Sequence, residues 1–254
     1  MEPEILAAWT GLLSSWDAWL LNVVLVVLVP VLGYVRFRQF VASDDRVAPR
    51  RTKLVLYGRT VGFQWCLVGA MLLVLWHRGL SVSDVGERIG DADLTFGVTV
   101  ALLFILAIVS AIILIRGRRP RPAKPTPDVS RLQKLVPAFG LEMAGFIVVC
   151  LTAGVCEELL YRGWLVNFLR AATGSAWVAV VVSAILFGIG HAYQGRWAML
   201  RAAFVGLQLA ILFVVVGSLI PGQVLHAGVD VLAGVAGALA ASRLSPGLDG
   251  AGSL

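Results

Sequence analysis

Residues 146–168 read FIVVCLTAGVCEELLYRGWLVNF, an apolar run that is interrupted by two adjacent glutamates and an arginine. The run is long enough to cross the hydrocarbon core of a membrane, which takes about 20 residues of helix. A charged side chain at that depth costs about 3 kcal/mol on insertion scales, so such residues normally face a bundle interior and have a function. We therefore expect Glu157, Glu158 and Arg162 to line an internal polar site.

The composition of the whole chain is that of an integral membrane protein. Hydrophobic residues make up 59% of the 254 positions and charged residues 14%, and the mean hydropathy is +0.87. These values exclude an ordinary water-soluble globular domain. The formal net charge of +6 comes from lysines and arginines that cluster between apolar runs. We interpret it as a signal of membrane orientation and expect no nucleic-acid partner.

The apolar runs predict an all-α, polytopic bundle of about seven transmembrane helices, within a range of six to eight, around an intramembrane polar cavity. The predicted spans are residues 18–35, 54–76, 94–115, 136–168, 176–191, 199–216 and 222–241. The loops that follow the first and third spans are rich in lysine and arginine. If the N-terminus is outside, both loops are cytoplasmic, and so is the C-terminus.

The charge pattern also divides the chain into three regions. Residues 1–135 are expected to form N-terminal transmembrane helices and a basic cytoplasmic loop, with no chemical motif. Residues 136–241 contain nearly all the ionisable residues at membrane depth and are expected to form the core that carries the function. Residues 242–254 are expected to be a flexible C-terminal tail.

The spacing of the three charges separates the two glutamates. Glu158 and Arg162 are i and i+4 on a helix, where a carboxylate and a guanidinium meet on one face. Glu157 is rotated from Glu158 by about 100° and points elsewhere. Two carboxylates in one dry site cannot both be ionised cheaply, so one of them could serve as a base. The spacing alone is equally compatible with a solvated pair at the membrane interface.

Two histidines lie at membrane depth on later segments. His191 ends the run VVVSAILFGIGH, whose glycines at 188 and 190 allow a neighbouring backbone or a substrate to approach closely. His226 and Asp230 are again i and i+4, and a carboxylate one turn away fixes the tautomer of an imidazole.

Together these side chains form a set that could activate water. Glutamate could act directly as a general base with histidine as its partner. Alternatively, Glu157, His191 and His226 could hold a divalent metal such as zinc that has an open position. Cys156 is a rival nucleophile, although apolar surroundings disfavour the thiolate. The reaction class that the pattern indicates is hydrolysis.

The three motifs resemble those of the CAAX-protease and bacteriocin-processing (CPBP, or Abi) family of intramembrane proteases, which is related to the type II CAAX prenyl endopeptidases. The family pattern is Glu-Glu-x-x-x-Arg, then Phe-x-x-x-His, then His-x-x-x-Asn or Asp. This sequence has EELLYR at 157–162, FGIGH at 187–191 and HAGVD at 226–230. The resemblance covers about residues 136–241. It implies an integral-membrane endopeptidase in the lipid bilayer, with peptide or membrane-protein substrates.

The resemblance also implies roles for individual residues. Glu157 would be the general base that activates the attacking water, with His191 as its partner. Glu158 and Arg162 would orient that site.

The same comparison assigns His226 and residue 230 to the oxyanion of the tetrahedral intermediate. Position 230 is Asp here, whereas the prenyl endopeptidases have Asn. An ionised aspartate cannot donate a hydrogen bond, so Asp230 is either protonated in a dry pocket or positions His226. The resemblance does not decide whether a metal takes part, and no cofactor is certain.

Two other functions would use the same residues. One is a non-catalytic membrane scaffold or bacteriocin-immunity protein, and the other is a proton-coupled transporter. The abundance of Ala, Val, Gly and Arg indicates a bacterial cell membrane, where prenylated substrates are not expected. Neither the substrate nor the oligomeric state follows from the sequence.

Overall fold

The computed structural model describes residues 3–41, 48–116 and 136–244, and within these ranges every regular element is a helix. Six helices are long and apolar enough to cross a membrane: Trp16–Phe40, Arg50–His77, Ala92–Ile113, Leu141–Thr173, Arg196–Val216 and Ile220–Ala241. The remaining predicted span, 176–191, forms the shorter apolar helix Ala176–Gly190. The prediction of an all-α, multi-pass membrane protein is confirmed.

The elements differ from the predicted spans mainly at their ends. Their order is α1 (Pro3–Leu12), α2 (Trp16–Val23), η1 (Val24–Leu28), α3 (Val29–Val41), α4 (Arg50–His77), α5 (Ala92–Arg116), α7 (Leu141–Glu157), η2 (Glu158–Val166), α8 (Asn167–Thr173), α9 (Ala176–Gly190), η3 (Ala192–Gln194), α10 (Arg196–Val216) and α11 (Ile220–Leu244). Helix α11 extends three residues into the predicted tail. The rest of that tail and the basic loop at 117–135 lie outside the described residues.

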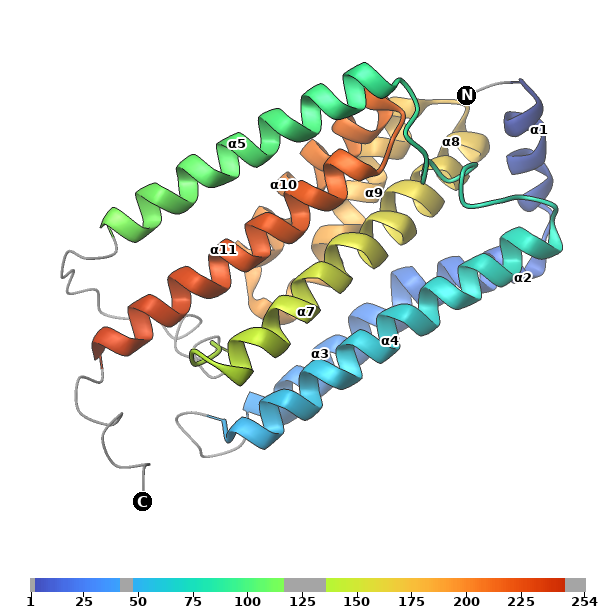
Figure 1. Ribbon diagram of the computed structural model, residues 1–254. Coiled ribbons are helices and arrows are strands. Elements are labelled where there is room, and N and C mark those ends of the chain that lie inside the picture. The colour runs from blue at the N-terminus through green and yellow to red at the C-terminus, as the bar shows by residue number, and fades with distance from the viewer. Residues whose placement is uncertain (1–2, 42–47, 117–135, 245–254) are drawn as a thin grey trace.

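The long helices lie side by side, and α7 is central among them. Figure 1 shows α5, α11, α7 and α4 in this order across the bundle, with α9 and α10 behind them. The packed pairs include α11 with α7, α7 with α4, α11 with α5, and α9 with α10. Helix α7 therefore contacts both the N-terminal half of the chain and the last helix.

Short local signals set several helix ends. The side chain of Ser15 accepts a hydrogen bond from the backbone N–H of Ala18, and that of Ser175 accepts one from Val178, so each serine caps the start of a helix. Helix α10 ends at Gly217, whose φ of 72° is the left-handed conformation that glycine adopts without strain. These signals are readable in the sequence once the helices are known.

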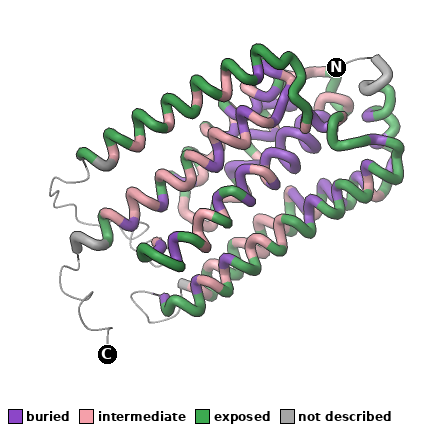
Figure 2. Tube along the Cα trace, in the orientation of Figure 1, coloured by how far each residue is buried: buried purple, intermediate pink, exposed green. Residues whose placement is uncertain are grey.

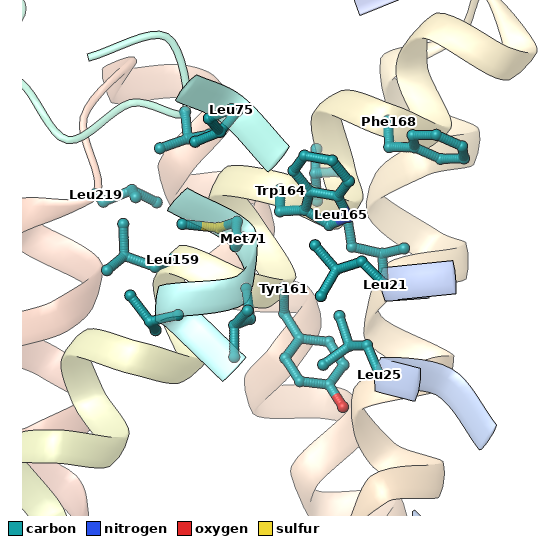
Figure 3. Packing of buried hydrophobic residues seen from close by; sticks show 14 of the residues in the cluster. Leu21, Leu25, Met71, Leu75, Leu159, Tyr161, Trp164, Leu165, Phe168 and Leu219 are labelled. Carbon is teal, nitrogen blue, oxygen red and sulfur yellow. The ribbon is translucent and has the colours of Figure 1, made fainter. Parts of the chain in front are cut away.

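The apolar core is concentrated around η2. Figure 2 shows most of the buried residues in the centre of the bundle, whereas α5 is largely exposed on its outer side. Trp164 and Leu165 pack in one cluster with Leu21 of α2 and Met71 of α4 (Figure 3). The fully buried indole of Trp164 donates a hydrogen bond to Asn22 Oδ1 at 3.1 Å. The N-terminal helices thus enclose η2.

Helix α1 was not predicted from the sequence. It carries Trp9, which is fully buried and whose ring centroid lies 5.5 Å from that of Trp164. Helix α1 also packs against α8. It is too short to cross a membrane, so a search for long apolar spans does not find it.

Glycines let the central helices approach closely. A Cβ atom at Gly154 of α7 would lie 2.7 Å from Ala227 Cβ and 2.9 Å from the backbone N of Ala227 in α11. At Gly188 of α9, a Cβ would lie 2.7 Å from Ala203 Cβ in α10. The expected close approach at position 188 is therefore a helix–helix contact, of the kind that small residues allow in membranes.

We predict that Gly154→Ala destabilises the protein by about 1–3 kcal/mol, because the added methyl group forces α7 and α11 apart. The measurement is the thermal unfolding midpoint of purified protein in detergent micelles. Gly69→Ala in α4 is the matched control, since a Cβ there meets nothing within 4 Å. Equal midpoints for the parent and Gly154→Ala would contradict the close packing of these two helices.

Candidate active site

The glutamate–arginine motif lies on a π-helical segment. Helix α7 ends at Glu157, and η2 continues the chain from Glu158 to Val166. A π-helix has i→i+5 hydrogen bonds and is found frequently at functional sites. Every residue of η2 is buried, and Glu158 and Arg162 are 0% and 1% exposed. Glu158 and its partner Arg162 are therefore not solvated.

Arg162 is held from several sides. Its Nη1 lies 2.9 Å from Glu158 Oε1, so the two charges meet as the i and i+4 spacing predicts. Its Nη2 donates to the backbone carbonyl of Gly206 at 3.2 Å, and its Cζ lies 4.3 Å from the ring centroid of Phe187. These contacts come from α9 and α10. A cation over an aromatic face is stabilised further when it is desolvated.

Glu158 also binds His226 of α11. His226 Nδ1 lies 2.8 Å from Glu158 Oε1, and the histidine is 6% exposed. The Glu158 carboxylate, paired with Arg162, can only accept, so Nδ1 carries a hydrogen and donates it. This leaves the other ring nitrogen, Nε2, for the rest of the site.

Two further carboxylates lie near that second nitrogen. His226 Nε2 is 3.8 Å from Glu157 Oε2 and 3.6 Å from Asp230 Oδ2. Both distances are longer than a hydrogen bond. The Asp230 side chain is 42% exposed and that of Glu157 is 19% exposed, whereas that of Glu158 is 1% exposed. The two adjacent glutamates therefore occupy different environments.

The best-placed neighbour of Glu157 is a residue that sequence reasoning missed. Gln64 of α4 donates from Nε2 to Glu157 Oε1 at 2.8 Å. Gln64 belongs to the region in which no motif was found. The available signal was a single amide within the apolar stretch GFQWCLVG at 62–69. A lone polar residue in a span does not reveal which helix it faces.

His191 is held at the end of α9 by a backbone contact. It follows the last residue of α9, and its Nδ1 lies 2.9 Å from the backbone carbonyl of Phe187. Because a carbonyl only accepts, Nδ1 is the donor and Nε2 is the nitrogen left for other partners. Among the residues that the structure describes, Glu157 accepts a hydrogen bond from Gln64 and lies 3.8 Å from His226. The pairing of His191 with Glu157 stays a prediction.

The predicted metal ligands do not fit a metal ion in this arrangement. Among the residues that the structure describes, no three or more His, Cys, Asp and Glu side chains are grouped so that they could hold one. One nitrogen of His226 is already bound to Glu158, and the other is 3.8 Å from Glu157. The geometry therefore does not support the trio of Glu157, His191 and His226 as a zinc site. Cys156, the rival nucleophile, is fully buried in the apolar core cluster.

We predict that Arg162→Met lowers the free energy of unfolding by about 3–5 kcal/mol, because it leaves the carboxylate of Glu158 buried without its counter-charge. The double variant Arg162→Met/Glu158→Gln should recover part of this loss. The control is a less buried ion pair, in which Arg78 Nη2 lies 2.8 Å from Asp17 Oδ1. Arg78→Met should cost less than about 1 kcal/mol.

These differences would be measured by unfolding the purified proteins in the same micelles. The single variant Glu158→Gln would be measured as well. A loss in the double variant equal to the sum of the losses in Arg162→Met and Glu158→Gln would show that Glu158 and Arg162 do not act as a pair.

Residues 139–232 match the family model described as Type II CAAX prenyl endopeptidase Rce1-like. The matched range contains α7, η2, α8, α9 and α10, with about half of α11. It includes all six predicted site residues, at positions 157, 158, 162, 191, 226 and 230. No curated protein and no solved structure matches the chain.

Proposed function

Residues 139–232 of this multi-pass membrane protein belong to the Rce1-like type II CAAX prenyl endopeptidase family, and from this premise we propose that the chain is an integral-membrane endopeptidase. It would hydrolyse peptide bonds with a water molecule that Glu157 activates. The observation that carries the proposal is the buried cluster in which His226 lies between two carboxylates, 2.8 Å from Glu158 and 3.8 Å from Glu157.

The different environments of the two glutamates support different roles. Glu158 is bound by Arg162 and His226, so it is fixed as an acceptor and orients the site. Glu157 has one oxygen held by Gln64, while its Oε2 makes no hydrogen bond with the described residues. Because Oε2 is not engaged in such a hydrogen bond, it is available to accept a proton from water. We therefore assign the general base to Glu157.

The proposed reaction has two steps. In the first, a water molecule attacks the carbonyl carbon of the scissile peptide bond and gives its proton to Glu157, which produces a tetrahedral oxyanion. In the second, the oxyanion collapses, the C–N bond breaks, and the proton passes to the departing amine. The catalytic carboxylate is thereby restored, and no metal takes part in either step.

The histidines and Asp230 complete this scheme. His226, held at Nδ1 by Glu158, would donate from Nε2 to the oxyanion when it is protonated at both nitrogens. A carboxylate cannot donate, so we assign Asp230 to the positioning of His226, 3.6 Å away. His191, whose Nδ1 is held by a backbone carbonyl, would offer Nε2 as the second proton carrier.

The proposed substrates are peptides or membrane proteins that reach α7 from the bilayer. The matching family model is described as a CAAX prenyl endopeptidase, so a farnesylated CAAX peptide is the first probe. We propose a bacterial cell membrane as the location, with a cytoplasmic C-terminus, from the composition and the lysine- and arginine-rich loops.

The function is tested with the purified chain in lipid nanodiscs. The probes are a farnesylated CAAX peptide, the same peptide without the lipid, and a transmembrane peptide, with cleavage products identified by mass spectrometry. Glu157→Gln should lower the cleavage rate by about 10²–10⁴-fold, because an amide cannot accept the proton. Cys156→Ala should cleave at the parental rate.

Each variant needs an unfolding midpoint near that of the parent before its rate is interpreted. Retained cleavage in Glu157→Gln would contradict the proposed base, and loss of cleavage in Cys156→Ala would favour the thiol. A parent protein that binds but cuts none of the three peptides would instead favour the non-catalytic scaffold.

A further inference from the structure

One hydrogen bond links the motif-free part of the chain to the proposed base. Gln64 of α4 and Glu157 at the end of α7 are separated by 93 positions in the sequence, and the donor and acceptor atoms are 2.8 Å apart. Glu157 lies inside the range matched by the family model, and Gln64 lies outside it. A residue outside the recognised domain therefore touches the carboxylate on which the proposed reaction depends.

The carbonyl oxygen of the Gln64 amide has no hydrogen-bond partner among the residues that the structure describes. This atom, Oε1, is buried, while Nε2 is bound to Glu157. A buried acceptor without a partner is unfavourable for folding and calls for an explanation. An apolar residue would avoid this penalty in a membrane span. The amide is therefore poorly explained by stability alone.

Helix α4 is fixed against α7, so that Gln64 has a defined position. Lys53, near the start of α4, donates to Glu142 Oε2 of α7 at 2.9 Å, and both residues are buried. On the other side of Gln64, Met71 belongs to the same apolar cluster as Leu159 of η2. Contacts before and after Gln64 thus hold the two helices together. This arrangement can orient the carboxylate with precision.

We infer that Gln64 is a positioning residue for Glu157, an inference that rests on the proposed function. Its Nε2 holds Glu157 Oε1, and this hold presents the other oxygen, Oε2, to His226 and to the attacking water. When Glu157 takes the proton on Oε2, its Oε1 becomes the carbonyl oxygen of the acid and still accepts from Gln64 Nε2. The contact can therefore persist in both protonation states of Glu157.

The kinetic test replaces the amide with an apolar side chain of similar length. Gln64→Met should lower kcat for the cleaved probe peptide by about 10- to 100-fold, as misplacement of a catalytic group does, and should change KM by less than about twofold. Thr60→Val is the matched control, because Thr60 lies one turn earlier on α4 and its hydroxyl bonds only to Leu56 O. The control should keep the parental kcat.

Stability separates positioning from a structural role. Gln64→Met removes an unsatisfied buried acceptor, so its unfolding midpoint should be equal to or above that of the parent. A lower kcat with an undiminished midpoint supports the inference. A parental kcat, or a fall in kcat that is accompanied by a matching loss of stability, overturns it.

An infrared measurement tests the contact without any activity. The difference spectrum between the parent and Gln64→Met should show a shifted carboxylate stretching band, because one Glu157 oxygen loses its donor. The same difference measured in the Glu157→Gln background should lack that band. If the parent cuts no peptide but the band is present, the proposed function fails while the contact stands. If the band is absent, the positioning role is overturned.

Discussion

The centre of the bundle depends on an ion pair that is fully withdrawn from solvent. Glu158 and Arg162 are 0% and 1% exposed, and such charges are tolerated in a membrane protein only when each is paired and hydrogen-bonded. Arg162 obtains its partners from α9 and α10, and Glu158 obtains a second one from His226 of α11. Three helices, α9, α10 and α11, therefore supply the contacts that this buried pair makes beyond η2.

The same constraint separates two residues that are identical in chemistry and adjacent in sequence. Glu158 is bound by both a guanidinium and an imidazole, so its carboxylate has little freedom to change partners. Glu157 lies at the junction of α7 and η2 and is partly exposed, and one of its oxygens makes no hydrogen bond with the described part of the chain. Different environments for two carboxyl groups are a common way to divide structural and proton-transfer roles.

The N-terminal helices take part in this centre although they carry no motif. Asn22 accepts from the indole of Trp164 in η2, Lys53 pairs with Glu142 in α7, and Gln64 donates to Glu157. The division of the chain near residue 135 stays a prediction from the charge pattern. The packing crosses it at several points, so the matched family domain does not form its site alone.

Hydropathy and spacing in the sequence determined the all-helical, multi-pass architecture, the meeting of Glu158 with Arg162, and the family model that residues 139–232 match. These features are local or repeat with the helical period, so they can be read from neighbouring residues. Only the tertiary structure decided the π-helical form of η2, the short helix α1, the contact of Gln64 with Glu157 and the nitrogen of His226 that faces Glu158. Each of these depends on which distant helices pack together. The apolar spans have similar compositions, so no local sequence pattern predicts which spans are neighbours in the bundle.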